Sequence, residues 1–473
     1  MKRIKLKMGL TSAVITAVVI ACVIIFNSIV ALIGDKAPLT VDLTRDKVYE
    51  FSDQTKDLMK NLDTEIIAYC LIPDGTEGEY VDYIKTYLEK YKTLNKNFKV
   101  EYIDPYENPA FMQKYNDGEN QANIGSVIVT SGDEFKVITF EQIYTQNSVT
   151  NAVQIDMERK VTNAVMSVTG MLVTSNIYFT EGHGEYNGEY LSYLLKDEGY
   201  NCENLNITVN GIPEDADIIF SIIPTADFTA EERDALDSFM DNGGKYILLA
   251  DPQMPVMEKL DSYLEEWGIK LNHDFVVETD SDSALSAGTG LPIPVAKLQQ
   301  HTITEKLMEA KSPLVMPSSV SVTVTTAKNG ASAQKLLMTS NKAYGKTNLN
   351  SATIEKEDGD ISGPLCMAAI SEKQGEKSSA LMVIGSPMVI SSPYGVYSLL
   401  EEKSYLNGDF VLNSINYLSG SSASTSIRAK QISPETMTMT EKQVAVSVIL
   451  LQYVLPALII ILGLIVWLRR RFK

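Results

Sequence analysis

Two long uncharged apolar runs, one near each end of the chain, constrain this sequence more than any other feature. Met8–Gly34 and Gln443–Leu468 hold 27 and 26 residues without a single Asp, Glu, Lys or Arg. A helix needs about 20 apolar residues to cross the hydrocarbon core of a bilayer, so each run can span it with some tilt. The sequence therefore predicts one transmembrane helix at residues 8–34 and another at residues 443–468.

The charges that flank the two runs predict their orientation. Residues 1–7 and 469–473 each carry four Lys or Arg residues and no acid. Basic flanks stay in the cytoplasm, so we expect two cytoplasmic tails and an extracytoplasmic segment over residues 35–442. We also expect the first run to stay uncleaved, because the apolar core of a signal peptide is only about 7–15 residues long.

The expected extracytoplasmic part is strongly acidic. The two tails hold eight of the 41 Lys and Arg residues and none of the 60 acids, which leaves a net charge of −27 on the rest of the chain. A surface of this sign repels nucleic acid and anionic lipid, which excludes both as expected partners. The four cysteines are scattered and form no CxxC pair, which predicts buried thiols rather than a disulfide framework.

Residues 35–150 read as a first α/β unit with the order β-α-β-α-β-β. Strands are predicted at residues 65–72 and 98–103, and a hairpin around Gly132 and Asp133. The pattern resembles a small thioredoxin-like α/β unit without its redox cysteines. Tyrosines at helical spacing over residues 80–91 indicate either a docking face or core packing.

A linking helix is expected over residues 151–175, and a second α/β unit begins after it. Within residues 176–277, strands are predicted at 176–180, 217–223 and 246–250, and helices between them. Thr229 and Glu232 form a capping box at the start of the helix expected over residues 231–242. Continuous apolar strands of this kind are typical of a buried parallel sheet. Residues 278–360 are rich in Ser, Thr, Ala and Lys and predict a β-rich insertion. The α/β pattern returns over residues 361–420, and residues 421–442 form a polar spacer.

Several segments, taken in order, resemble a known family. They are VDLTRDKVYEFSDQTKDLMKNL, YFTEGHGEYNGEYLSYLLKDEGY, TAEERDALDSFMDNGGKYILLADP, ALMVIGSP and GDFVLNSINYLSG, between the two terminal apolar runs. This order resembles the GldG-type auxiliary proteins of ABC transport systems, named after gliding-motility components, over nearly the whole chain. The resemblance implies a partner ABC permease and a cytoplasmic ATPase. It also implies an amidotransferase-like (flavodoxin-like) fold for the second unit, used without known catalysis.

The loops after the predicted parallel strands contain the candidate site residues. Ligands bind outside the carboxyl ends of the strands in open α/β sheets, so Glu181, His183, Glu185, Thr225 and Asp251 form a candidate ligand cleft. A crevice without a ligand is the alternative. Zinc sites usually draw on two or three closely spaced His or Cys residues, and only one His stands here, so a structural glycine loop is favoured over a metal site.

Two further motifs bear on catalysis. Enzymes of the implied fold place Cys or Ser on a tight turn directly after a strand, but the turn after Ile223 reads Pro-Thr-Ala-Asp and no GxSxG occurs. Gly345-Lys346-Thr347 has the ending of a phosphate-binding loop, but Ser340 occupies a position where that loop requires glycine. We therefore expect no catalytic residue, no metal and no cofactor.

These patterns lead to one main hypothesis and two alternatives. The main hypothesis is a non-enzymatic, membrane-anchored accessory or ligand-sensing subunit of an ABC transporter. The first alternative is an extracytoplasmic hydrolase that acts on cell-envelope material and uses His183 with its neighbouring acids. The second is a purely structural scaffold of the envelope.

Overall fold

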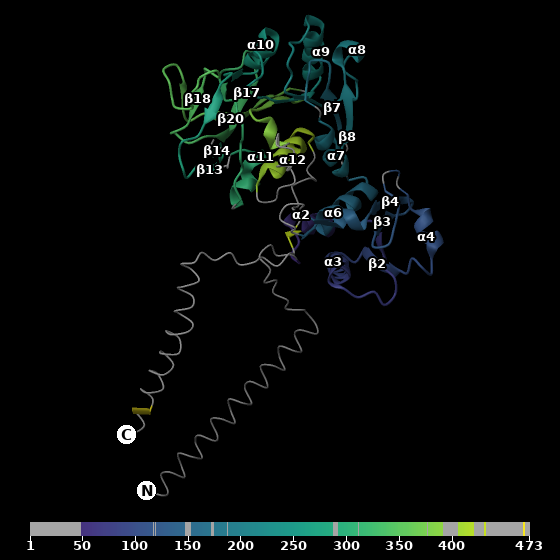
Figure 1. The fold of residues 1–473 in the computed structure, drawn as a ribbon. Coiled ribbons are helices and arrows are strands. Elements are labelled where there is room, and N and C mark those ends of the chain that lie inside the picture. The colour runs from purple at the N-terminus through teal and green to yellow at the C-terminus, as the bar shows by residue number, and fades with distance from the viewer. Residues whose placement is uncertain are drawn as a thin grey trace.

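A computed structural model of the chain describes residues 49–390, apart from 117, 119, 147–152, 172–174, 187, 287–291, 311 and 376, together with 405–420, 430–431 and 467–468. The two expected transmembrane segments and the basic tails lie outside the described residues, except for 467–468. None of the helices within the described residues has the length and apolarity that a membrane span requires. The described chain forms two α/β units (Figure 1), and its mixed sheets confirm the predicted α/β class.

The first unit contains a four-stranded sheet with the order β2-β1-β3-β4. β1 (Ile66–Leu71) pairs parallel with β2 (Phe98–Ile103) and antiparallel with β3 (Val127–Ser131), which pairs antiparallel with β4 (Glu134–Ile138). The hairpin predicted around Gly132 and Asp133 is thus confirmed. The helices of this unit are α2 (Asp53–Lys60), α3 (Glu79–Leu94), α4 (Pro109–Lys114), α5 (Phe140–Ile143) and α6 (Met157–Val168).

Helix α6, from the region expected to link the units, packs on β3 and β4 of the first unit. Its buried Glu158 accepts hydrogen bonds from Ser52 N at 2.6 Å and from Thr55 Oγ1 at 2.9 Å, which ties α2 to α6. Tyr91 of α3 is buried and donates its hydroxyl to Glu158 O at 2.9 Å. Tyr87 is buried as well, so this end of the tyrosine stripe is core.

The second unit contains a ten-stranded sheet (Figure 1). Its parallel part has the order β8-β7-β9-β10-β21, formed by β7 (Asn176–Thr180), β8 (Asn201–Leu205), β9 (Ile218–Ile222), β10 (Lys245–Leu249) and β21 (Ser379–Ile384). The antiparallel part continues with β20 (Cys366–Lys373), β17 (Ser332–Met338), β16 (Val322–Val324), β15 (Lys297–Leu298) and β11 (Ile269–Leu271).

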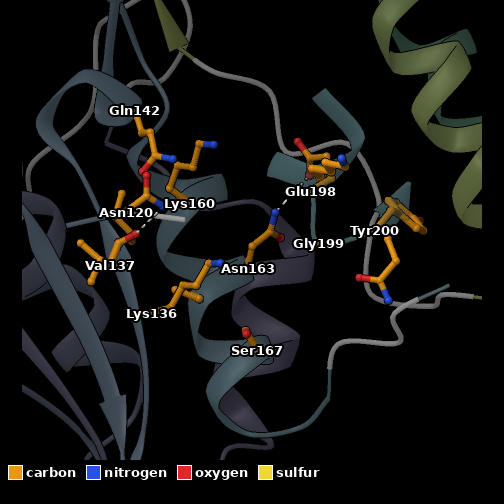
Figure 2. Close-up of a pocket in the computed structure, with 14 residues that line it drawn as sticks. Asn120, Lys136, Val137, Gln142, Lys160, Asn163, Ser167, Glu198, Gly199 and Tyr200 are labelled. Atoms are coloured by element: carbon orange, nitrogen blue, oxygen red, sulfur yellow. Dashed lines mark hydrogen bonds between the residues drawn. The ribbon is translucent and has the colours of Figure 1, made fainter. Parts of the chain in front are cut away.

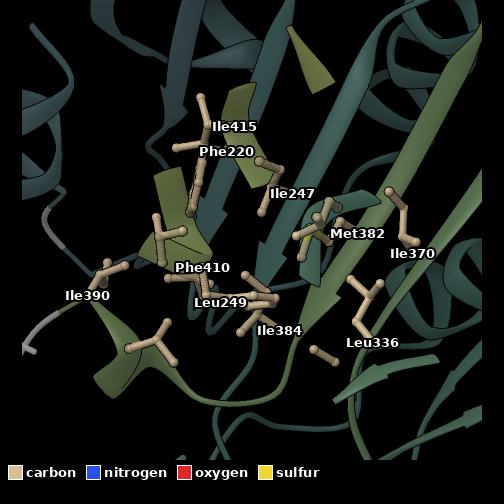
Figure 3. Close-up of a cluster of buried hydrophobic side chains, with 14 of the residues drawn as sticks. Phe220, Ile247, Leu249, Leu336, Ile370, Met382, Ile384, Ile390, Phe410 and Ile415 are labelled. Carbon is tan, nitrogen blue, oxygen red and sulfur yellow. The ribbon is translucent and has the colours of Figure 1, made fainter. Parts of the chain in front are cut away.

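Helices cover both faces of this sheet, because its central strands are apolar on both sides. Phe220 and Ile247 face one core and Ile219 and Tyr246 face the other. Figure 3 shows the first core, in which strand residues lie against Phe410 of α12. The first face carries α7 (Glu189–Asp197), α11 (Thr302–Glu305) and α12 (Asn407–Leu418), and the second carries α9 (Ala230–Asp241) and α10 (Glu258–Glu266).

Shorter elements complete the two units. The region expected to be a β-rich insertion, residues 278–360, contributes β15, β16 and β17 to the large sheet and also contains a hairpin of β13 (Ala284–Ser286) and β14 (Pro292–Pro294). A three-stranded sheet is formed by β18 (Tyr344–Lys346) of this region with β12 (Phe275–Val277) and β19 (Ile361–Ser362) on either side of it in the chain. One-turn helices occur at α8 (Ile207–Asn210), η1 (Lys306–Glu309) and η2 (Pro387–Val389). Near the end of the chain, β22 (Lys430–Gln431) pairs with β6 (Val153–Ile155), which also pairs with β5 (Tyr144–Gln146).

Candidate functional site

The strand order of the parallel sheet reverses between β7 and β9. Ligands in open parallel sheets bind at such a switch point, in the crevice outside the carboxyl ends of the strands. Two loops meet there, one after β7 (residues 181–188) and one after β9 (residues 223–229). They carry four of the five candidate residues, and the fifth, Asp251, follows β10.

The two loops are hydrogen bonded to each other across the switch point. The backbone N–H groups of Thr225 and Ala226 donate to His183 O at 2.8 and 3.0 Å, and Thr225 Oγ1 donates to the same carbonyl at 3.1 Å. Gly184 has φ +73°, and a Cβ there would lie 2.2 Å from Thr225 Oγ1. Only glycine therefore allows the loop after β7 to lie this close to the loop after β9.

His183 is buried between two carboxylates, with an exposed fraction of 7%. Its Nε2 lies 3.1 Å from Glu232 Oε2, and its Nδ1 lies 3.4 Å from Glu185 Oε1. The backbone N–H of His183 donates to the other oxygen of Glu185 at 2.7 Å. The ring of Phe228 packs edge-on against the imidazole, with 5.4 Å between the centroids. His183 thus connects the loop after β7 with the loop after β9 and with the first turn of α9.

Glu232 joins this group, although the sequence indicated it only as part of a capping box. Its carboxylate accepts hydrogen bonds from Thr229 N at 2.8 Å, from Thr208 Oγ1 and from the His183 ring. Burial raises the pKa of Glu232, but the hydrogen bonds from Thr208 and Thr229 and the nearby His183 outweigh it and hold the pKa at about 2. Glu232 is therefore an ionised acceptor that fastens α8 and the loop after β7 to the start of α9.

The structure brings together only part of the predicted set. His183, Glu185 and Thr225 lie in one connected group. Glu181 is exposed, and half-buried Asp251 accepts a hydrogen bond from Gln253 N at 2.8 Å, while burial raises its pKa. Within the part of the chain that the structure describes, no group of three or more His, Cys, Asp or Glu side chains is arranged to hold a metal ion.

A family model described as an ABC-type uncharacterized transport system matches residues 174–414, which is just over half of the chain. This chain belongs to that family. The resemblance to auxiliary components of ABC transport systems is thereby confirmed, whereas a role in gliding stays a prediction. A second model, a domain of unknown function, matches residues 45–150. No curated protein matches the chain.

Solved structures similar to this family member share little sequence with it. The mmIFT52 N-terminal domain is 16% identical, with 52% of this chain and 97% of that chain covered and a TM-score of 0.38. A ThuA-like protein from Bacteroides uniformis ATCC 8492 is 13% identical, with 52% and 91% covered and a TM-score of 0.31. Similarities at this level carry no argument about function.

The turn after β9 in this ABC-type family member has a strained backbone. Ile223 has φ +50°, a conformation that a β-branched residue rarely adopts. A sharp, strained strand-to-helix turn is where several hydrolase folds expose a nucleophile. Here the position carries an isoleucine that packs against both cores of the sheet, and Pro224 follows it.

The lysine of the Gly345-Lys346-Thr347 segment is used within the protein. Lys346 is buried, donates to Glu355 O at 2.8 Å and pairs with Glu357 at 2.8 Å and Asp360 at 3.6 Å. These partners lie next to the small sheet of β12, β18 and β19. The contacts support the interpretation of this motif as a structural coincidence rather than a phosphate-binding loop.

Proposed function

We propose that this protein is a non-enzymatic accessory subunit of an ABC transporter, anchored in the membrane near both ends of the chain. The observation that carries the non-enzymatic part is the contact between His183 and Glu232. Both side chains are buried, and their hydrogen bonds connect the loop after β7 and helix α8 to the start of α9. A general acid or base needs access to a substrate proton, and these contacts argue against that use.

The positions of α2 and β22, near the two ends of the folded region, support the two-anchor arrangement. The described chain begins next to α2, which packs on α6, and β22 pairs with β6 directly before α6. Both ends therefore lie against the first unit. Neighbouring attachment points for the two anchors fit the predicted topology, with both termini in the cytoplasm and residues 35–442 outside.

We also propose that the first unit is a thioredoxin-like module without redox activity. Its support is the sheet order β2-β1-β3-β4, in which β3 is antiparallel to its neighbours. Cys70 lies inside β1, and burial raises its pKa to about 12. Such a thiol stays protonated at neutral pH and is a poor nucleophile. In this proposal the module serves contacts with the permease.

Co-purification tests the proposed partners. The tagged full-length chain is extracted in mild detergent after crosslinking in cells, and the bound proteins are identified by mass spectrometry. We expect a multi-span permease and an ATPase. The matched control is an unrelated tagged protein with two membrane spans, crosslinked and extracted in the same way. The proposal is wrong if neither partner is recovered with the natural chain, or if the control recovers both partners equally well.

Cysteine labelling tests the topology. In a chain without native cysteines, a cysteine replaces Ala352, which is exposed, and in separate variants it replaces Lys2 or Lys473. A membrane-impermeant thiol reagent should label the cysteine at position 352 in intact cells and the two terminal cysteines only after lysis. If the cells have an outer membrane, it is first permeabilised. Labelling of a terminal cysteine in intact cells would contradict the predicted orientation.

A further inference from the structure

A cavity lies where the two units meet (Figure 2). Its volume is about 220 Å³. The first unit contributes residues of β4 and α6, and the second contributes the end of α7 and the start of β8. It lies beside the outer strand β8 of the large sheet, one strand away from the pair β7 and β9, so it is distinct from the group around His183.

Three lysines from three elements line this cavity. They are Lys136 on β4, Lys160 on α6 and Lys196 on α7. Lys160 is the buried one, with an exposed fraction of 8%. Figure 2 shows Lys136 extending from the β4 side toward Asn163 of α6. Such a concentration of ammonium groups stands out in a chain whose net charge is −19.

The acid that lines the cavity already has basic and polar partners. Glu198 is the single acid among the fourteen described residues that form the wall. It pairs with the guanidinium of Arg159, and Asn163 Nδ2 donates to it at 3.1 Å. Arg159 also pairs with Asp156. Among the described residues, the wall of the cavity therefore combines three lysines with one carboxylate, and that carboxylate is bound by Arg159 and Asn163.

The remaining wall suits a small oxyanion. Side-chain amides of Asn120, Gln142 and Asn163 lie among the lysines. Asn120 Nδ2 donates to Val137 O and Asn163 Nδ2 donates to Glu198, so the ammonium groups are the main donors to phosphate or carboxylate oxygens in this wall. The volume is below the ~300–1,000 Å³ of drug-sized ligand sites, which favours a compact group. A second cavity of about 510 Å³ shares Lys196, Tyr200 and Asn201 with the first, so a ligand that carries the oxyanion has room to continue there.

We propose that this cavity binds an oxyanionic ligand through its phosphate or carboxylate group, with Lys136 and Lys196 as the main cations. Because Lys136 belongs to the first unit and Lys196 to the second, the bound oxyanion links the two units. Binding then stabilises one relative placement of the units. This inference goes beyond the proposed function and does not depend on a transporter partner, since it concerns the chain alone.

Calorimetric titration of the purified full-length chain in detergent tests the site. The probes are inorganic phosphate and citrate, and sodium chloride at the same ionic strength is the reference. We expect at least one oxyanion to bind where chloride does not. Lys136→Gln and Lys196→Gln should each weaken binding about five- to tenfold, as expected for charge-assisted hydrogen bonds in a partly exposed site.

Lys270→Gln is the matched control. Lys270 is an exposed lysine on β11, and β11 and β8 stand at opposite ends of the large sheet, so its loss should leave binding unchanged. Thermal unfolding without ligand shows whether each variant is folded. Phosphate binding alone or citrate binding alone identifies the preferred oxyanion. The proposal is overturned if neither probe binds beyond chloride, if both cavity variants bind like the natural chain, or if Lys270→Gln weakens binding equally.

Discussion

Replacing Glu232 by alanine removes three hydrogen bonds from one buried carboxylate. The exposed fraction of Glu232 is 3%, so water replaces little of what is lost. Loss of the capping contact with Thr229 costs about 1 kcal/mol, and loss of the contacts with Thr208 and His183 costs about 2 kcal/mol more. For a unit of this size, ~3 kcal/mol corresponds to a decrease in Tm of about 6–12 °C.

Tryptophan fluorescence during heating measures this decrease. The chain has two tryptophans, and Trp267 is buried in the second unit beside α10. In a Trp467→Phe background, the signal therefore reports on that unit. Glu231→Ala is the matched control, because Glu231 stands in the same first turn of α9 but is exposed. It should shift Tm by no more than about 2 °C, and a similar small shift for Glu232→Ala would refute the reasoning.

The same contact predicts a pH dependence. The folded-state pKa of Glu232 is about 2, below its ordinary value of 4.5. A carboxyl with a lowered folded-state pKa contributes stability that is fully present above pH 4.5 and is lost as the pH falls toward 2. The difference in Tm between the natural chain and Glu232→Gln should therefore shrink over this range. A double-mutant cycle with His183→Ala should give a coupling energy of about 1 kcal/mol at neutral pH.

The buried thiols, Lys346 and Gly184 each lead to a further prediction. In a Cys22→Ala chain at pH 8, the three remaining thiols should react with a disulfide reagent only after unfolding. Burial raises their pKa values, to about 12 for Cys70, about 11 for Cys202 and about 12 for Cys366. Rapid reaction of the folded chain would contradict this prediction. Lys346→Met should lower the Tm in thermal unfolding, because Glu357 and Asp360 lose their cation; an unchanged Tm would contradict the assigned contacts. Gly184→Ala should lower the free energy of unfolding by about 2 kcal/mol more than Gly211→Ala. Both glycines have positive φ, but only at Gly184 would the new Cβ lie 2.2 Å from another atom, Thr225 Oγ1. Equal losses for the two variants would contradict the importance of this contact.

Much of the second unit follows from local sequence signals. Strands predicted at residues 176–180, 217–223 and 246–250 occur as β7 (176–180), β9 (218–222) and β10 (245–249). Continuous apolar runs bounded by Pro, Gly and Asp define such strands within a few residues. The capping box of Thr229 and Glu232 forms as predicted, because its two hydrogen bonds join residues only three positions apart.

The sequence by itself thus determined strands β7, β9 and β10, the parallel character of this part of the sheet and the loops that meet at its switch point. It did not determine that residues 297–373 extend the same sheet with antiparallel strands. It did not determine that His183 contacts Glu232, 49 positions away, or that Lys136, Lys160 and Lys196 line one cavity. Hydrophobic periodicity and capping act over a few neighbouring residues, whereas these contacts depend on how whole strands and helices pack. Only the tertiary structure therefore decided that the predicted histidine is buried between carboxylates, and that lysines far apart in the chain converge between the two units.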